Sequence, residues 1–304
     1  SSIGTSLNGA FTYCFIIPIP FAPLKICINP SGNYGGGASR QLAQMVDING
    51  DGFPDLASSN DANDLRVRLS TIGKTNMLKT VYRPMGASFS MDYKRMGNTY
   101  EMAQSKWVLS KVEIFDGLNG DGPTRTANRF EYADGYYDRR ERDFYGFATV
   151  ISTQLNTADN DAPYRVVTQE YNNQNYYEKG LLLREVMIDA AGNRYTETLN
   201  TYEVRDITTG IPLASPTTNV MDPGFPALLK TEKRFYEGQQ TAGLSTETHW
   251  KYDLAGNIIQ YTETGDGTPQ DSLQAVIAYH TLPSVGLSSI PNSIRVQAGD
   301  QKDI

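Results

Sequence analysis

This sequence of 304 residues has little helical periodicity, no long apolar run and no block of a single charge. Its 34 acidic and 27 basic residues give a net charge of -7 and are spread along the chain, so no basic patch is available for a phosphate backbone. The most apolar stretch, residues 11–28, is broken by three prolines and a lysine and does not supply the roughly 18–20 apolar residues of a membrane span. We therefore expect neither nucleic acid nor a membrane span, and we interpret residues 11–28 as extended, proline-kinked chain.

Cysteine and histidine are scarce, with two residues of each. Cys14 and Cys27 could meet across a hairpin and form a disulfide, and two buried free thiols are the alternative. His249 and His280 occur in strand-like contexts without a nucleophile elbow, so strand positions explain them better than a Ser-His-Asp triad. No signal peptide is visible, and the start at Ser1 without Met favours an excised or processed segment.

What the chain does contain is a series of short runs rich in Tyr, Thr, Val and Ile, each bounded by Gly, Asn, Asp or Pro. The 19 tyrosines and the alternation of apolar with polar positions suit sheets with one packed face and one wet face. The sequence therefore predicts an all-β fold of antiparallel strands and hairpins. The runs are residues 165–171, 181–188, 194–204, 228–236, 246–252, 257–264 and 275–282.

An internal repeat supports this prediction. Residues 189–198 read DAAGNRYTET and residues 253–264 read DLAGNIIQYTET, so each copy has the form strand, turn, strand. The Gly-Asn pair of each copy supplies the positive φ angles of a tight hairpin, and the first Asp of each copy can accept hydrogen bonds from the turn amides. These residues are Asp189, Gly192 and Asn193 in the first copy and Asp253, Gly256 and Asn257 in the second.

Loops and boundaries follow from proline and polar content. Residues 208–227 hold four prolines and are expected to form a long surface loop between the two repeats, and residues 58–65 a shorter polar loop. We divide the chain near residues 75 and 155, which gives segments 1–75, 76–155 and 156–304.

Oxygen side chains alternate with other residues in the stretch DINGDGFPD, at the spacing and with the glycines that a calcium loop requires. The expected ligands are Asp47, Asn49, Asp51, Asp55 and the carbonyl of Phe53. An EF-hand is excluded because Ser58 replaces its last Glu and neither flank is helical. All ligands are local and no nucleophile or base is attached to them, so we expect a structural calcium loop of the β type, with an Asx-rich turn that holds no ion as the alternative.

Two further polar stretches have simpler interpretations. The acidic turn at residues 116–123 has the wrong spacing for the same calcium loop and is interpreted as a tight hairpin turn, with a metal site as the alternative. The cluster YYDRRERDFYGF at residues 136–147 could bind an anionic or peptide ligand, but cross-strand ion pairs and stacked rings are favoured, with Gly146 at a bend. No pair of carboxylates is singled out for glycoside hydrolysis.

At this point the motifs resemble a known family. Residues 32–56, with the glycines before the acidic turn, look like the strand and integrin-type (FG-GAP-like) calcium loop of virulence-plasmid B-type proteins and of the B components of insecticidal toxin complexes. Residues 110–150 resemble the middle region of the same proteins. The two D-x-A-G-N units are similar to the YD repeats of Rhs proteins, although Ile188 replaces the tyrosine in the first unit.

The resemblance implies a segment of a large hollow β-shell that encloses a toxic segment, next to a β-propeller that docks on a translocation partner. In this picture residues 1–75 are propeller-type with the calcium loop, residues 76–155 are the middle region of the B component, and residues 156–304 belong to the Rhs/YD-repeat shell. The implied partners are other segments of the parent toxin and a translocation component, and the implied location is secreted or at the bacterial cell surface.

Catalytic functions of such families are not supported by the residues present. The chain has no Glu-x-Glu pair of an ADP-ribosyltransferase and lacks the closing Rhs motif that accompanies self-cleavage, and residues 221–225 (MDPGF) are better explained as a proline-rich turn. We therefore expect no enzyme but a non-catalytic scaffold segment of a secreted polymorphic toxin. The alternative is a calcium-dependent extracellular module that binds glycan or protein.

Overall fold

The computed structural model divides the chain into two compact units, one formed by residues 1–49 and 53–72 and the other by residues 50–52 and 73–304. It describes residues 2–10, 12–17, 24–28, 31–39, 43–61, 63–118, 120, 122, 124–214, 223–265, 272–282, 284 and 286–299, with only the backbone of the strands before residue 40. The division lies close to the predicted boundary at residue 75. No helix in the described ranges is long and apolar enough to cross a membrane.

The first unit consists of three small antiparallel sheets. Their strands pair as β1 with β4, β2 with β3, and β5 with β6 and β7. The bounds are β1 Ser2–Ala10, β2 Tyr13–Ile17, β3 Leu24–Ile28, β4 Ser31–Ser39, β5 Ala43–Val46, β6 Asp55–Asp61 and β7 Asp64–Arg68. Strands β2 and β3 agree with the extended chain predicted for residues 11–28, and their register places Cys14 directly opposite Cys27. Whether the two cysteines are bridged stays open.

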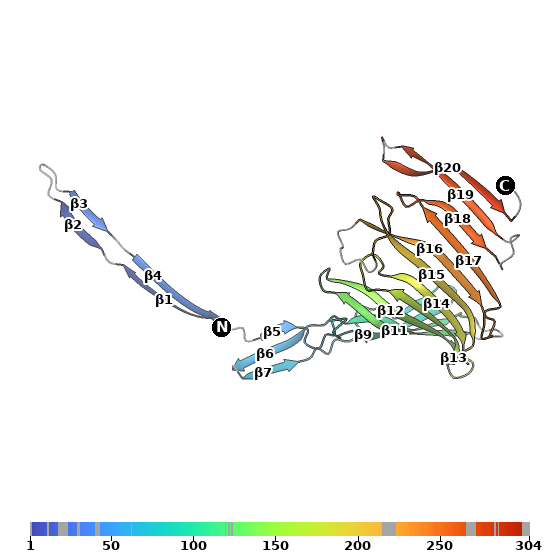
Figure 1. Cartoon of the computed structure of the whole chain (residues 1–304). Coiled ribbons are helices and arrows are strands. Elements are labelled where there is room, and N and C mark those ends of the chain that lie inside the picture. The colour runs from blue at the N-terminus through green and yellow to red at the C-terminus, as the bar shows by residue number, and fades with distance from the viewer. Residues whose placement is uncertain are drawn as a thin grey trace. The chain divides into compact units, whose positions relative to one another are not determined.

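The second unit is built on one sheet of 13 strands that follow one another in chain order (Figure 1). Every neighbouring pair is antiparallel, as predicted. The strands are β8 Thr80–Tyr82, β9 Ser88–Met96, β10 Lys106–Phe115, β11 Arg125–Asp138, β12 Asp143–Asn156, β13 Ala162–Asn172, β14 Leu181–Asp189, β15 Arg194–Asp206, β16 Gly224–Phe235, β17 Leu244–Tyr252, β18 Ile258–Thr264, β19 Leu273–Leu282 and β20 Leu287–Ala298. Residue 155 lies inside β12, so the predicted division there does not coincide with a break in the sheet.

All seven runs predicted as strands are strands, but two predicted loops are wrong in extent. Residues 58–65 contribute to β6 and β7, because backbone pairing between these strands outweighs the polar side chains. Strand β16 begins at Gly224, inside the predicted loop 208–227, and residues 215–222 lie outside the described ranges. The connection at residues 116–124 joins β10 to β11 as predicted, though it is longer than a tight turn.

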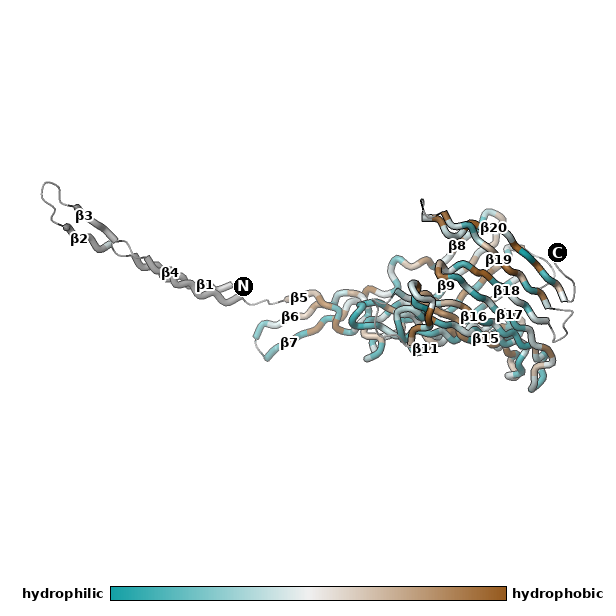
Figure 2. The backbone as a smooth tube through the Cα atoms, turned by 45° about the horizontal axis from the view of Figure 1, so that its top comes forward, coloured by the Kyte–Doolittle hydropathy of each residue, from teal (hydrophilic) through white to brown (hydrophobic). Residues whose placement is uncertain are grey.

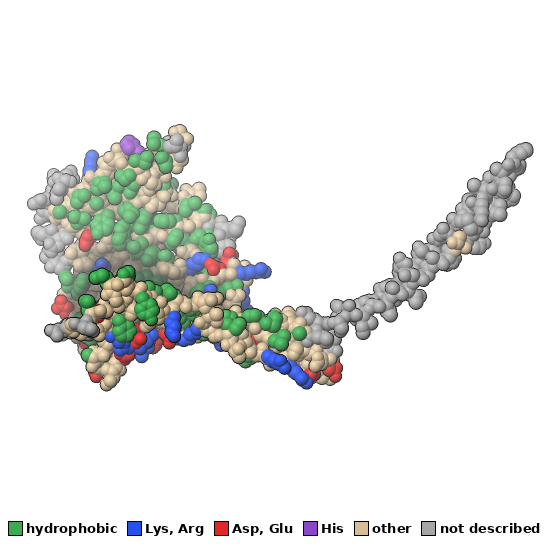
Figure 3. Space-filling view, turned by 180° about the vertical axis from the view of Figure 1, so that it is seen from behind, with side chains coloured by type: hydrophobic (Ala, Val, Ile, Leu, Met, Phe, Trp, Pro, Cys, Tyr) green, Lys and Arg blue, Asp and Glu red, His purple; other side chains and the backbone are tan. Residues whose placement is uncertain are grey.

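The large sheet has few fully buried apolar side chains, because its faces are mostly half exposed. Hydrophobic and hydrophilic residues both occur along β18, β19 and β20 in Figure 2, and Figure 3 shows hydrophobic side chains gathered over one face of the sheet. Register assigns side chains to the two faces: Trp250 of β17 lies opposite Tyr261 of β18, with ring centroids 6.1 Å apart, while the next pair, Lys251 and Gln260, belongs to the other face. Among the described residues the buried apolar set is Met102, Ala127, Tyr145, Leu155, Val186, Val204, Ala227 and Tyr236.

The two repeat turns have the same hydrogen bonds. In the first, the Asp189 carboxylate accepts from the amides of Ala191 and Asn193 at 2.9 and 2.8 Å and from the Asn193 side chain at 2.8 Å. Asp253 makes the equivalent bonds at 2.9 Å each. The predicted positive φ occurs at the glycine of each copy, 87° at Gly192 and 81° at Gly256. The asparagines do not have positive φ; their side chains donate hydrogen bonds to the aspartates.

A fully buried amide connects β11, β12 and β13 where the first two strands are irregular. Asn173, directly after β13 and only 1% exposed, donates from Nδ2 to the carbonyls of Asp134 at 2.7 Å and Gly146 at 3.0 Å. Both acceptor residues have positive φ, 55° at Asp134 and 100° at Gly146, so their carbonyls leave the regular ladder. The Asn173 side chain therefore donates hydrogen bonds to two carbonyls that lie at irregular positions of the sheet.

We expect Asn173→Ala to lower the free energy of unfolding by about 1–3 kcal/mol, because it leaves buried carbonyls without this donor. The matched control is Asn292→Ala in exposed β20, which we expect to change stability by less than about 0.5 kcal/mol. Urea unfolding followed by circular dichroism measures both. Equal effects of the two substitutions would show that the buried amide contributes nothing special.

Candidate functional site

The acidic turn predicted to bind calcium is shaped in the first unit by Asp55, which begins β6 and is 0% exposed. Its carboxylate accepts from the backbone amides of Ser70 at 2.7 Å, Ile48 at 3.0 Å and Asn49 at 3.4 Å. The pKa of Asp55 is lowered below its ordinary value, mainly by the hydrogen bond from the Ser70 amide and then by those from Ile48 and Asn49. Burial acts in the opposite direction but is outweighed. Asp55 is therefore a charged cap of its own turn.

Residues 50–52 of the same turn belong to the second unit. Gly50 and Gly52 have φ angles of 73° and 81°, which confirms that the glycines allow the chain to curl. The buried Asp51 carboxylate lies 3.5 Å from the Arg95 guanidinium, and the Ser105 hydroxyl donates to the Gly50 carbonyl.

No group of three or more His, Cys, Asp or Glu side chains in the described part of the chain could hold a metal ion. Of the predicted ligands, Asp47, Asn49, Phe53 and Asp55 lie in the first unit and Asp51 lies in the second. Both oxygens of the Asp55 carboxylate accept hydrogen bonds from backbone amides, which is the arrangement expected of an Asx-rich turn. Calcium binding stays a prediction, and no chemical step depends on it.

A row of charged side chains crosses the large sheet from β13 to β17 on one face. It starts with Arg184, which contacts Glu170 at 2.9 Å on one side and Glu197 at 2.7 Å on the other. It continues through Arg234, whose guanidinium reaches Glu197 at 3.6 Å and Glu232 at 2.5 Å. It ends at Lys230, 3.1 Å from both Glu232 and Glu247, and at His249, 3.0 Å from Glu247. We call these eight residues the charge row.

Glu197 is the buried centre of the charge row. Its side chain is 5% exposed and also accepts a hydrogen bond from the Tyr236 hydroxyl at 2.7 Å. Burial alone would raise the pKa of Glu197, but the hydrogen bonds from Tyr236 and Arg184 outweigh it and leave the pKa lowered. The carboxylate is thus held charged, which suits structure rather than proton transfer.

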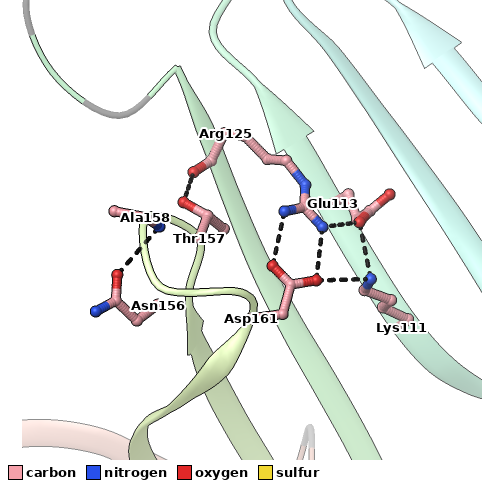
Figure 4. A network of polar contacts seen from close by, with 7 residues as sticks. All are labelled: Lys111, Glu113, Arg125, Asn156, Thr157, Ala158 and Asp161. Atoms are coloured by element: carbon pink, nitrogen blue, oxygen red, sulfur yellow. Dashed lines mark hydrogen bonds and ion pairs between the residues drawn. The ribbon is translucent and has the colours of Figure 1, made fainter.

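A second network ties β10 and β11 to the turn after β12 (Figure 4). Arg125 binds Asp161 through two bonds of 2.7 and 2.9 Å and also contacts Glu113, while Lys111 lies 2.9 Å from Glu113 and 3.3 Å from Asp161. Arg125, assisted by Lys111 against the effect of burial, lowers the pKa of Asp161 to about 2. Arg125 first and Lys111 second likewise lower the pKa of Glu113.

The cluster at residues 136–147 forms the tip of the β11–β12 hairpin. The rings contact each other, but they are tilted instead of stacked: the Tyr136 and Tyr145 centroids are 5.8 Å apart at an interplanar angle of 52°. Arg139 lies 4.5 Å from the centre of the Tyr100 ring. Asp138 caps the turn by accepting from the amides of Arg140 and Glu141 at 2.8 Å each. The ion pair here reaches outside the hairpin, from Asp143 to Lys179 at 2.6 Å.

The two histidines lie in strands, as predicted. His249 in β17 contacts Glu247, and His280 is an exposed residue of β19 opposite Ile290 of β20. Sequence reasoning missed Asn173 and the charge row. The signal was present as charges at alternate positions of successive strands, but only the register shows that they share one face.

Comparisons with known proteins agree with the resemblance found in the motifs. Residues 17–180, more than half of the chain, match the family model described as the insecticide toxin TcdB middle/N-terminal region. No curated protein sequence matches the chain.

Solved structures share the fold. A TcdB2-TccC3 structure without its hypervariable C-terminal region is 16% identical, covers 90% of this chain and aligns with a TM-score of 0.60. The complex TcdB2-TccC3-Cdc42 and a Photorhabdus luminescens Tc holotoxin pore are each 15% identical, cover 84% of this chain and give a TM-score of 0.59. The match spans only 16% of the latter two solved chains and 17% of the first, so the chain corresponds to a small part of their length.

We expect Asp55→Ala to lower the melting temperature in EDTA and in calcium alike, because the amides of Ile48, Asn49 and Ser70 lose their acceptor in both conditions. Calcium binding predicts a separate effect. EDTA would lower the melting temperature of the unchanged protein, and Asp47→Ala would mimic that loss. The corresponding loss in the free energy of unfolding is about 2.7 kcal/mol at a hundredfold excess of calcium over its dissociation constant. Differential scanning calorimetry separates the two, and absence of a chelator effect would leave the ion-free turn.

The network around Arg125 predicts a defined loss of stability in acid. Because the folded pKa of Asp161 is about 2 and its ordinary value is 3.8, its contribution to stability is complete above about pH 4 and is lost as pH falls towards 2. Asp161→Asn should lower the melting temperature at pH 7 and flatten its dependence between pH 4 and 2. The control is Asp64→Asn, whose partner Arg66 is 67% exposed and which should leave the pH profile unchanged. A pH profile of Asp161→Asn parallel to that of the unchanged protein would refute this role.

Proposed function

The chain belongs to the insecticide toxin TcdB middle/N-terminal region family, and from this membership we propose that it is a non-catalytic wall segment of a secreted bacterial toxin. In this role it helps to form a shell that encloses or delivers a toxic payload. Its partners are other segments of the parent toxin and a translocation component, in keeping with the TccC3 chain and the holotoxin pore named for the similar structures.

The observation that carries the proposal is the form of the large sheet. Its 13 strands follow in chain order, and in the described part of the chain its first and last strands, β8 and β20, each pair on one side only. A sheet of this kind can be extended at either edge by further antiparallel strands without rearrangement. Few apolar side chains are fully buried, so its stability does not depend on a second layer packed over the whole of either face.

The titratable groups support a non-catalytic role. Arg125 and Lys111 lower the pKa values of Glu113 and Asp161. The hydrogen bonds from Tyr236 and Arg184 lower the pKa of Glu197 against the effect of burial. A general acid or base, in contrast, needs a pKa near the working pH. The Asp-x-Ala-Gly-Asn turns support assignment of the later strands to YD-type repeats, because both copies have one hydrogen-bond pattern. Calcium binding and a propeller-type first segment remain parts of the proposal that rest on the sequence alone.

The proposal is tested at the exposed edge. In the longer toxin that contains this chain, lysines at two exposed positions of β20, Ile290→Lys and Ile294→Lys, should block strand addition and make the enclosed payload sensitive to protease. The matched control places two lysines one strand further in, at the exposed residues Val276 and Leu282 of β19, and should leave the payload protected.

Unchanged protection in the β20 variant would contradict the wall role. So would hydrolytic turnover by the purified chain that His249→Ala or His280→Ala abolishes.

A further inference from the structure

The first four strands of the first unit, β1 to β4, are a part of the chain that the wall role leaves unexplained. They form two ladders, β1 with β4 and β2 with β3, and neither ladder pairs with a further strand in the described part of the chain. Ala10 pairs with Ser31 and Tyr13 with Ile28, so two residues on each side separate the ladders and the register continues unchanged. We call these four strands the ribbon.

The β1–β4 ladder of the ribbon has a weakly specified register. Four of its nine residue pairs contain glycine, and in two of them, Gly4 with Gly37 and Gly9 with Gly32, both partners are glycine. Glycine has no side chain to pack against a cross-strand neighbour, so glycine-rich strands are prone to slip. An isolated two-stranded hairpin is also only marginally stable in water. The ribbon therefore needs a further constraint to hold one register.

The β2–β3 ladder places the two cysteines of the chain at directly opposite positions. Cys14 is the register partner of Cys27, and the ladder continues on both sides of this pair. Directly opposite residues of antiparallel strands have Cα atoms about 4.5–5.5 Å apart. Disulfides span Cα distances of about 4.4–6.8 Å. A bond between these two positions is therefore compatible with the observed pairing.

We propose that Cys14 and Cys27 form a cross-strand disulfide that fixes the register of the ribbon. On oxidation the two thiols lose two protons and two electrons and one S–S bond forms. A small disulfide such as oxidised glutathione takes up these protons and electrons and becomes two thiols. A slip by one residue would place Cys14 opposite Ile26 or Ile28, so the bond excludes it.

The bond also acts on the unfolded ribbon, because it closes the loop between residues 14 and 27 and removes conformations from the unfolded state. The 13-stranded sheet of the second unit contains neither cysteine. The disulfide and the wall role therefore fail independently of each other.

The first test treats the purified full chain with oxidised glutathione under native conditions and digests it without reductant. Mass spectrometry should find a peptide pair linked through Cys14 and Cys27, and the intact oxidised chain should be lighter than the reduced chain by two hydrogen atoms. Free thiols, thiols that stop at the mixed disulfide with glutathione, or a bond between two chains would overturn the proposal.

The matched control exchanges two neighbours in β2 through the double substitution Cys14→Phe and Phe15→Cys. It keeps the composition but moves the thiol to the position opposite Ile26, which belongs to the other face of the ladder. We expect the internal bond to form at least about tenfold more slowly in this variant, because the thiol is out of register with Cys27. Equal rates would show that the register does not bring the cysteines together.

Hydrogen exchange tests whether the bond fixes the ribbon. Reduction of the unchanged protein should make the amides of β1 and β4 exchange at least about tenfold faster, because the ladder is then free to slip and open. Strands β10 to β12 hold no cysteine and serve as the internal control, with the same exchange rates in both forms. Ribbon amides that exchange equally fast before and after reduction would contradict the proposed role of the bond.

Discussion

The cross-strand pairing of charges on one face of the large sheet is the constraint on which the second unit depends. A sheet without a second layer over its whole surface cannot rely on a thick hydrophobic core, so its polar face must stabilise the strands through side-chain pairs. The charge row does this across five strands from β13 to β17. Glu232 and Glu247 lie directly opposite each other, an unfavourable pair of like charges that Lys230 neutralises by contacting both.

Burial makes the central pair different from ordinary surface ion pairs. Exposed pairs contribute only about 0–1 kcal/mol, and Arg129 with Glu131, each about half exposed, belongs to that class. Glu197 is buried among Arg184, Arg234 and the Tyr236 hydroxyl, so removing a single partner leaves a charge without compensation. The row therefore fixes the register of β14, β15 and β16, and register decides which residues face each side of the sheet.

Much of the fold could be predicted from the sequence, because alternation and turn residues are local signals. The strands around Trp250 and Tyr261 and the turns at Asp189 and Asp253 follow from such signals. The role of Asn173 could not be predicted, because its two acceptor carbonyls are 39 and 27 residues away and belong to irregular positions of other strands. For the same reason the acidic turn was visible as a motif, while the amide from Ser70 that satisfies Asp55 was not.

The double-mutant cycle of Arg184→Met and Glu197→Gln tests the central claim most directly. Unfolding free energies of the two single variants and the double variant, measured by urea denaturation, give the coupling between these side chains. The account predicts that the loss of unfolding free energy in the double variant is smaller than the sum of the losses in the two single variants, by about 1–3 kcal/mol. Effects that add to within about 0.5 kcal/mol would show that the charge row does not hold the sheet together.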